Sequence, residues 1–388
     1  MGRSASWGWG KGIDGREAAR QAAQQALSRL GTNRAPAICL VFVSQEFEIG
    51  PVINGLTSVL GNVPLWGMST SRLITPIGEQ ARSVVVGLLA GSDINAQVSF
   101  WPGFSQNSNE TANQLIQALA EAKDSKGLLL AADGINGDIS RICAAITGFS
   151  SPVAGGMASG DIFQGKTYQI AGNQFGSGGL AVATLEGPLC IGIGIGHGWV
   201  DVGVHFEISK TRDIWVQELG NLPAAEVYSR TLGYPAREWA FPPLKELVRL
   251  YPLGIEVTSG SSELFIRSPL QMEVDGSLRM NIPVAEKQSA RLLIGDRNKC
   301  LEAAHQAART ALKTLAGAKP LLVMVLVDQA WQYLFQSDST RLISAVKAET
   351  GEIPLLGAYT LGQVYRNQEV GLVRAYNQKL MVVVFGEN

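Results

Sequence analysis

The sequence is poor in the residues that build metal and redox centres. It has four cysteines and three histidines among 388 residues. The cysteines, Cys39, Cys143, Cys190 and Cys300, are far apart, and no pair has the spacing of metal ligands. Since zinc needs three or four protein ligands, we expect no metal site and no cofactor. Four scattered thiols are typical of reduced, buried core residues in a cytoplasmic protein.

Long apolar runs and clusters of one charge are also missing. No run approaches the roughly 18 residues that span a bilayer. The formal net charge is -1 and the pI is about 6.4. Because no group of lysines and arginines stands out, the sequence predicts neither nucleic acid nor a membrane as a partner. We therefore expect a cytoplasmic location.

Composition favours a globular protein with a large core. Hydrophobic residues make up 46% of the chain and charged residues 17%. A chain of 388 residues is long for one core, which suggests two domains. The 44 glycines indicate many tight turns.

One short pattern occurs three times. Its copies are Val63–Thr70, Ser151–Ala158 and Ile353–Thr360, and in each a glycine stands three residues after a proline. Proline is tolerated at the first residue of a strand, because its missing N–H matters least there. The glycine permits a close approach of the backbone, either to a crowded neighbouring strand or to a ligand. The sequence leaves both alternatives open.

The surroundings of the pattern repeat as well. Each copy follows an apolar run and a segment with helical spacing, and precedes another apolar run. The runs are Ala37–Val43, Leu128–Ala132 and Leu321–Val327 before the copies, and Val84–Leu89, Leu180–Leu185 and Leu380–Phe385 after them. We predict an α/β fold with mixed β-sheets flanked by helices, built from repeated βαββ units in two related domains.

Two glycine-rich motifs resemble nucleotide-binding loops only superficially. Gly160–Thr167 fits the P-loop pattern, but the following residues alternate and break on glycine, whereas a P-loop leads into a helix. We expect a hairpin turn there. Ile191–Gly196 has the spacing GxGxG, not GxGxxG, and a strand-like sequence follows it.

Three carboxylates follow predicted strands. Asp133, Asp161 and Asp328 could meet as acid and base groups, but each is also a suitable turn former or helix cap. No serine elbow or cysteine–histidine pairing is evident, so we assign no catalytic residue.

The chain resembles the FIST (F-box and intracellular signal transduction) family. The resemblance lies in Gly198–His205, which leads into Thr211–Leu219 and Pro223–Tyr228, and in the first and third copies of the short pattern. It implies a FIST N-like α/β domain over residues 1–218 and a FIST C-like α/β domain over residues 219–388.

The chain also departs from the family pattern. Met68 stands where the family usually has a cysteine, and Leu73 and Gln363 stand near places where a glutamate is common. The resemblance implies a sensory module for signal transduction that binds small ligands, with amino acids or their relatives as suggested ligands. It does not imply catalysis.

Our functional hypothesis is a sensory protein that binds a small polar ligand and signals through a partner protein. Hydroxyl and amide groups would hold the ligand, and the guanidinium of Arg72 could hold a carboxylate. The predicted ligand-binding residues are Ser69, Thr70, Arg72, Gly155, Gly156, Tyr359, Thr360 and Gln363. The alternatives are a small-metabolite hydrolase or transferase using the strand-end carboxylates, and an interaction scaffold with a filled core.

Overall fold

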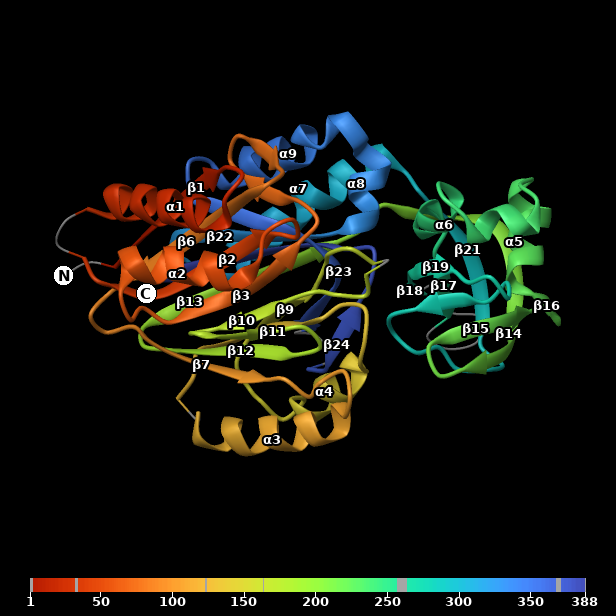
Figure 1. Cartoon of the computed structure of the whole chain (residues 1–388), viewed down its shortest axis with the longest axis horizontal. Helices are drawn as coiled ribbons and strands as arrows, with labels where there is room; N and C mark the ends of the chain where they lie inside the picture. The colour runs from red at the N-terminus through yellow and green to blue at the C-terminus, as the bar shows by residue number, and fades with distance from the viewer. Residues whose placement is uncertain are drawn as a thin grey trace.

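The protein is described by a computed structural model that covers residues 3–31, 34–122, 124–162, 164–256, 264–367 and 371–387. It is a mixed α/β structure. A body of two large sheets with helices on their outer faces fills most of the molecule, and a region around residues 199–295 forms a separate sheet beside it (Figure 1).

The first sheet has the strand order β1-β6-β2-β3-β10-β11. Only β2 and β3 run parallel to each other within it. Its part of the chain comprises β1 (Ser4–Lys11), α1 (Gly15–Leu30), β2 (Pro36–Ser44), α2 (Ile49–Leu60), β3 (Leu65–Thr70), β6 (Ser83–Ala90), β10 (Gln169–Ala171) and β11 (Gln174–Gly176). Asp14 begins α1 by accepting a hydrogen bond from the Arg16 N–H at 2.9 Å.

The second sheet has the order β13-β25-β22-β23-β9-β8-β12-β7, with β24 and β4 paired to β23 and β5 paired to β4. It joins strands from both halves of the chain. Its elements are β4 (Leu73–Thr75), β5 (Gly78–Gln80), β7 (Asn95–Trp101), α3 (Ser108–Glu121), β8 (Gly127–Asp133), α4 (Ile139–Ala145), β9 (Val153–Ala158), β12 (Leu180–Glu186), β13 (Leu189–Gly196), α7 (Arg297–Thr314), β22 (Lys319–Asp328), α8 (Gln329–Phe335), η3 (Gln336–Asp338), α9 (Thr340–Thr350), β23 (Leu355–Arg366), β24 (Val373–Tyr376) and β25 (Leu380–Glu387).

The third sheet belongs to a segment inserted between β13 and α7, which we call the inserted region. Its order is β18-β17-β21-β14-β15-β20-β19, with β16 beside β15. The elements are β14 (Trp199–Arg212), β15 (Trp215–Leu219), β16 (Leu222–Pro223), α5 (Ala224–Leu232), η1 (Ala236–Ala240), α6 (Leu244–Leu247), η2 (Val248–Leu250), β17 (Leu253–Glu256), β18 (Leu264–Arg267), β19 (Pro269–Met272), β20 (Leu278–Met280) and β21 (Ser289–Gly295).

The body's main core lies between the inner faces of the first two sheets. Strand β22 shows the alternation that builds it: Leu322, Met324 and Leu326 point into this core, whereas its valines contact α7, α8 and α9 on the other face. Helices α1 and α2 cover the outer face of the first sheet. Helices α3 and α4 cover the β8–β9 part of the second sheet.

The predicted apolar runs all lie within strands, and the hairpin turn predicted in Gly160–Thr167 is confirmed. Asp161 pairs with Lys166 as an antiparallel bridge, and the loop leads into β10, with no helix after it. A P-loop is therefore wrong for this stretch. Phe163 lies outside the described residues.

The glycines of Ile191–Gly196 serve close helix packing. A Cβ on Gly194 would lie 1.9 Å from the Ala307 carbonyl oxygen of α7, so only glycine lets this helix approach β13. A Cβ on Gly8 would likewise lie 2.1 Å from the Ala22 carbonyl oxygen of α1. No pattern in the sequence alone indicates β1, the strand that carries Gly8.

Candidate functional site

The predicted site residues lie at the carboxyl end of β3 and within the neighbouring strands β9 and β23. Ser69 and Thr70 end β3, and Arg72 follows directly. Strand β9 pairs antiparallel with β23, which places Gln363 opposite Gly156 and Val364 opposite Gly155. The parallel pairing of β22 with β23 sets Thr360 beside Asp328. The fold thus brings the three copies of the short pattern together.

Two hydroxyl groups join the ends of β3 and β9 to the middle of β23. The hydroxyl of Thr70 lies 2.8 Å from the carbonyl oxygen of Tyr359. The hydroxyl of Ser159 donates to the same oxygen at 2.7 Å and accepts from the Ser71 N–H at 2.9 Å. Ser159 and Ser71 were missed by the sequence analysis, although both immediately follow the copies of the pattern.

The other predicted hydroxyls also have protein partners. Ser69 donates to the carbonyl oxygen of Ser159 at 3.0 Å and accepts from the Tyr168 N–H at 2.9 Å. Thr360 donates to the Val327 oxygen at 3.3 Å and accepts from Gln363 at 2.8 Å. These side chains are buried, so they hold the frame of the site together.

The two predicted glycines lie in crowded places. A Cβ on Gly155 would stand 2.3 Å from the Leu130 carbonyl oxygen. A Cβ on Gly156 would stand 2.8 Å from the Thr360 methyl and 2.9 Å from the Met68 methyl. The structure therefore gives a packing reason for glycine at both positions.

Arg72 is the accessible member of the predicted set. Its side chain is 38% exposed and lies between two carboxylates, 3.6 Å from Glu46 and 3.5 Å from Glu79. Glu79 also accepts from the Tyr359 hydroxyl at 3.4 Å and from the Gln332 amide at 3.3 Å. We call Arg72, Glu46, Glu79, Gln332 and Tyr359 the Arg72 cluster.

The electrostatics of the Arg72 cluster follow from partial burial. Burial raises the pKa of Glu79, while Ser339, Arg72 and Tyr359 act against that shift. Burial also raises the pKa of Tyr359 well above its usual value, and the neighbouring Glu79 adds to the effect. The phenol is therefore a neutral donor at physiological pH. A partly exposed cation with two carboxylates, backed by a buried phenol, can bind a small polar molecule.

Sequence reasoning missed Glu46, Glu79 and Gln332. Glu46 follows β2, Glu79 lies in β5, and Gln332 lies in α8, far along the chain. The pairing of β4 with β5 and β23 brings Glu79 to Tyr359, and the parallel pairing of β2 with β3 brings Glu46 toward Arg72. No local pattern in the sequence could indicate that meeting.

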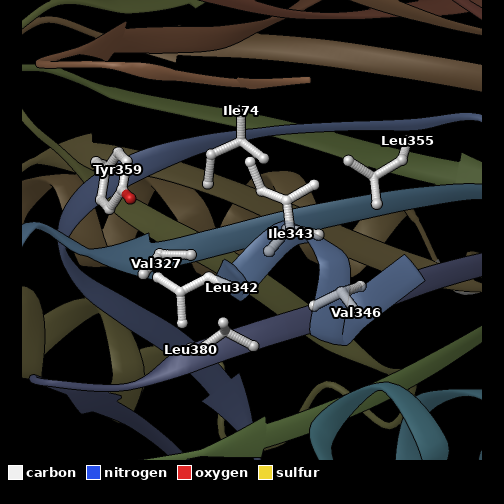
Figure 2. A pocket seen from close by; sticks show the side chains of 9 residues that line it. Ile74, Val327, Leu342, Ile343, Val346, Leu355, Tyr359 and Leu380 are labelled. Atoms are coloured by element: carbon white, nitrogen blue, oxygen red, sulfur yellow. The ribbon is translucent and has the colours of Figure 1, made fainter. Parts of the chain in front are cut away.

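A small cavity lies behind Tyr359, under α9. Figure 2 shows its lining of apolar side chains, including Ile74, Leu342 and Leu380, with the tyrosine ring at one end. Its volume is about 10 Å³, hardly enough for one water molecule. It is therefore a packing defect of the core, and polar ligands would find no partners in it.

The strand-end carboxylates act locally as turn and cap groups. Asp133 accepts the N–H groups of Ile135 and Asn136, each at 2.8 Å, and that of Gly178 at 2.9 Å. Asp161 accepts the Gln164 N–H at 3.2 Å. Burial raises the pKa of Asp133 despite these donors.

Asp328 differs because it also meets a buried arginine. It caps α8 by accepting the Ala330 N–H at 3.0 Å, and it accepts the Gln378 N–H at 2.8 Å. The Arg249 guanidinium lies 3.4 Å from it, and both side chains are completely buried. Burial raises the pKa of Asp328, while Arg249 lowers it.

The described residues also bear on metal binding and membrane insertion. No group of three histidine, cysteine, aspartate or glutamate side chains lies close enough to hold a metal ion. None of the helices described here is long and apolar enough to cross a membrane.

Comparison with protein families gives two matches. The FIST N domain matches residues 37–221, and the FIST C domain matches residues 224–366. No curated protein matches the chain.

Solved structures add little. "Structure of PurLQS from Thermotoga maritima" is 11% identical over 100% of this chain and 72% of that chain, with a TM-score of 0.25. "T. maritima PurL complexed with ADP" is 12% identical over 99% and 72%, with a TM-score of 0.26. Scores this low carry no argument about fold or function.

Proposed function

The chain belongs to the FIST family of signalling and sensory domain proteins, and from this we propose that it binds a small polar ligand at the Arg72 cluster. Binding would be the sensory event. The ligand class that suits the cluster best is a small zwitterion, such as an amino acid or a related metabolite.

The observation that carries the proposal is the position of Arg72 between Glu46 and Glu79. Both ion-pair distances, 3.6 and 3.5 Å, exceed those of a well-formed pair, and the guanidinium is 38% exposed. A ligand carboxylate could take donors from Arg72, while a ligand ammonium could take the place of the arginine beside Glu79. One cation next to carboxylates therefore matches both charges of a zwitterion.

The remaining predicted residues would support the ligand indirectly. The hydrogen bonds of Ser69 and Thr70 fix the turn that carries Arg72. Thr360 and Gln363 hold β23, which carries Tyr359. Gly155 and Gly156 allow β9 to pack closely beside it. In this proposal the eight residues form one site, with Arg72 and Tyr359 touching the ligand.

We further propose that the body is built from three copies of one βαββ unit. In support, three orders of strand pairing match: β1-β6-β2-β3, β7-β12-β8-β9 and β13-β25-β22-β23. In each order the last two strands are parallel and the others antiparallel. The Arg72 cluster would then lie where two of these units meet.

We propose that the signal passes to a partner protein. The proposal places this exchange in the cytoplasm. Ligand binding and partner binding are separate parts of the proposal, and ligand binding can be measured first.

The test is a thermal-shift screen of the full chain against amino acids and related metabolites. We expect a zwitterion to raise Tm by mass action. The shift should vanish in Arg72→Ala and shrink in Arg72→Lys, which keeps the charge but loses the planar fork. Arg141→Ala is the matched control, because Arg141 pairs with Asp138 on the surface. An equal shift in Arg72→Ala, or none in the native chain, would sink the proposal.

A further inference from the structure

Three edge strands of the body share one pattern of inward apolar side chains. Strand β1 lies at one end of the first sheet, and β7 and β13 lie at the two ends of the second. In each strand, every second residue packs against the main core between the sheets. Examples are Trp7 and Trp9 in β1, Val98 and Phe100 in β7, and Ile193 and Ile195 in β13. The outer faces and free edges of the three strands can therefore be compared.

A helix packs on the outer face of β1 and of β13, but the outer face of β7 differs. The outward residues Gly8 of β1 and Gly194 of β13 lie against α1 and α7, and both are buried. In the middle of β7 the outward residues are Gln97 and Ser99, and both are exposed. Helix α3 packs beside α4 over β8 and β9 instead (Figure 1). The outer face of β7 is therefore open to solvent at these two residues.

Helix side chains also occupy the free edges of β1 and β13. The Trp9 N–H of β1 donates to the Gln25 side-chain oxygen of α1 at 2.9 Å. The Ile193 N–H of β13 donates to the Thr314 hydroxyl of α7 at 3.1 Å. These bonds use backbone groups that could otherwise pair with another strand, which is one way to protect a sheet edge.

The backbone of β7 has no such protection. The Asp133 N–H donates to the Gly179 carbonyl oxygen at 3.0 Å, so every second residue of β12, counted from Gly179, faces β8. The residues between them face β7, and among these Val182 lies opposite Ser99. In β7, Ser99 and every second residue therefore bond with β12, whereas the others point to the free edge and bond there to no residue that the structure describes. These outward-pointing residues are Ala96, Val98 and Phe100.

We propose that β7 is a dimerisation edge, which pairs antiparallel with the β7 strand of a second copy of this chain. A two-fold axis beside Val98 lets this residue exchange both backbone hydrogen bonds with its counterpart, and lets Ala96 do the same with Phe100. Gln97 then lies opposite Ser99 on the outer face, an amide beside a hydroxyl. The second sheet continues from one copy into the other.

The composition of β7 favours a second copy as the occupant. Asn95–Trp101 contains no charged residue and no proline, which are two of the devices that keep edge strands from pairing with themselves. A strand that pairs around a two-fold axis brings its own residues face to face, and here they meet without like charges. The strand also offers no charge by which a different partner would be preferred. None of its residues belongs to the Arg72 cluster, so this proposal is independent of ligand binding.

The test is sedimentation equilibrium of the full chain over a range of protein concentrations, where we expect a reversible monomer–dimer equilibrium. Combining Gln97→Lys with Ser99→Lys sets like charges opposite each other on both sides of the axis and should weaken the dimer roughly tenfold. Combining Gln97→Glu with Ser99→Lys sets opposite charges face to face and should restore it. The matched control, Gln114→Lys with Gln117→Lys, adds the same charge on the exposed face of α3 and should change nothing.

The backbone bonds are tested separately. Ala96→Pro removes an outward N–H that makes no bond within the described chain, so Tm should stay close to that of the unchanged protein while the dimer is lost. Hydrogen exchange at the Val98 amide should slow as protein concentration rises, whereas exchange at Ser99, which already bonds with β12, should stay constant. A chain that remains monomeric at every concentration would overturn the proposal and leave this edge to a strand of another protein. A dimer of equal strength in all variants would overturn it too, because the contact would then lie elsewhere.

Discussion

The carboxyl ends of β8 and β22 share one hydrogen-bonding arrangement but differ in the partner that completes it. Each strand ends on a buried aspartate that accepts the N–H two residues later, from Ile135 or Ala330. Each aspartate also accepts an N–H from a residue two positions before the closing strand, Gly178 or Gln378. Both of these donor residues have left-handed backbone, with φ of 73° and 61°.

The difference lies in what completes the hydrogen bonding. Asp133 receives a further backbone N–H, from Asn136, and so closes its own loop. Asp328 receives Arg249 from the inserted region instead. The same local frame thus serves once as a self-contained turn and once as a docking point. Breaking the two ends should therefore have unequal consequences.

The largest expected effect is at the docking point. Arg249→Ala leaves the Asp328 carboxyl without its counter-charge in the interior, which typically costs about 3–5 kcal/mol of unfolding free energy. Combining Arg249→Met with Asp328→Asn should recover most of this loss. Urea unfolding of the unchanged protein, of Arg249→Ala and of the combined variant measures these differences in unfolding free energy. A loss under about 1 kcal/mol for Arg249→Ala, the size of an exposed pair, would contradict the distinction.

The self-contained turn should give a smaller effect. Asp133→Ala removes the carboxylate that accepts from three backbone N–H groups, and we expect a loss of about 2–3 kcal/mol of unfolding free energy. Asp133→Asn keeps one acceptor oxygen and should lose less. Urea unfolding again gives the numbers. If Asp133→Ala proved costlier than Arg249→Ala, the turn would matter more than the docking contact.

The smallest effect is a dependence on pH. Burial raises the folded-state pKa of Asp133, so between the unfolded and folded pKa values the native state binds more protons. The stability of the unchanged protein relative to Asp133→Asn should therefore fall as pH rises from about 4 through the folded-state pKa of Asp133. Unfolding at a series of pH values, with Asp14→Asn as an exposed control, measures the trend. A difference that stays constant, or grows with pH, would contradict it.

Local patterns predicted the strands well. Runs such as Leu128–Ala132 and Leu321–Val327 are apolar throughout because helices cover one face and the body core the other. In contrast, the alternation of tryptophan and glycine from Trp7 to Gly10 does not by itself indicate a strand, because glycine weakens a strand unless a helix packs against it.

Partners could not be predicted from local patterns. The sequence indicates that Ile353–Thr360 contains a strand, but not that this strand pairs with β9 and β4. For the same reason it predicted Arg72 and Tyr359 but missed Glu46 and Glu79. The sequence also indicates Asp328 as a candidate group but not its partner Arg249. The reason is that Arg249 lies in η2 of the inserted region, far from β22 along the chain. Chemistry that depends on distant segments appears only when the fold is known.

The way the inserted region is attached affects the order of folding. Its two ends meet, since Trp199 pairs with Gly295 and the Asp296 N–H donates to the Gly198 carbonyl oxygen at 2.9 Å. Once the inserted region has folded, its paired ends hold β13 and α7 close together, as a short loop would. Each halving of a loop saves about 0.6 kcal/mol of closure entropy. Early formation of this sheet would lower the contact order of the body and speed its assembly.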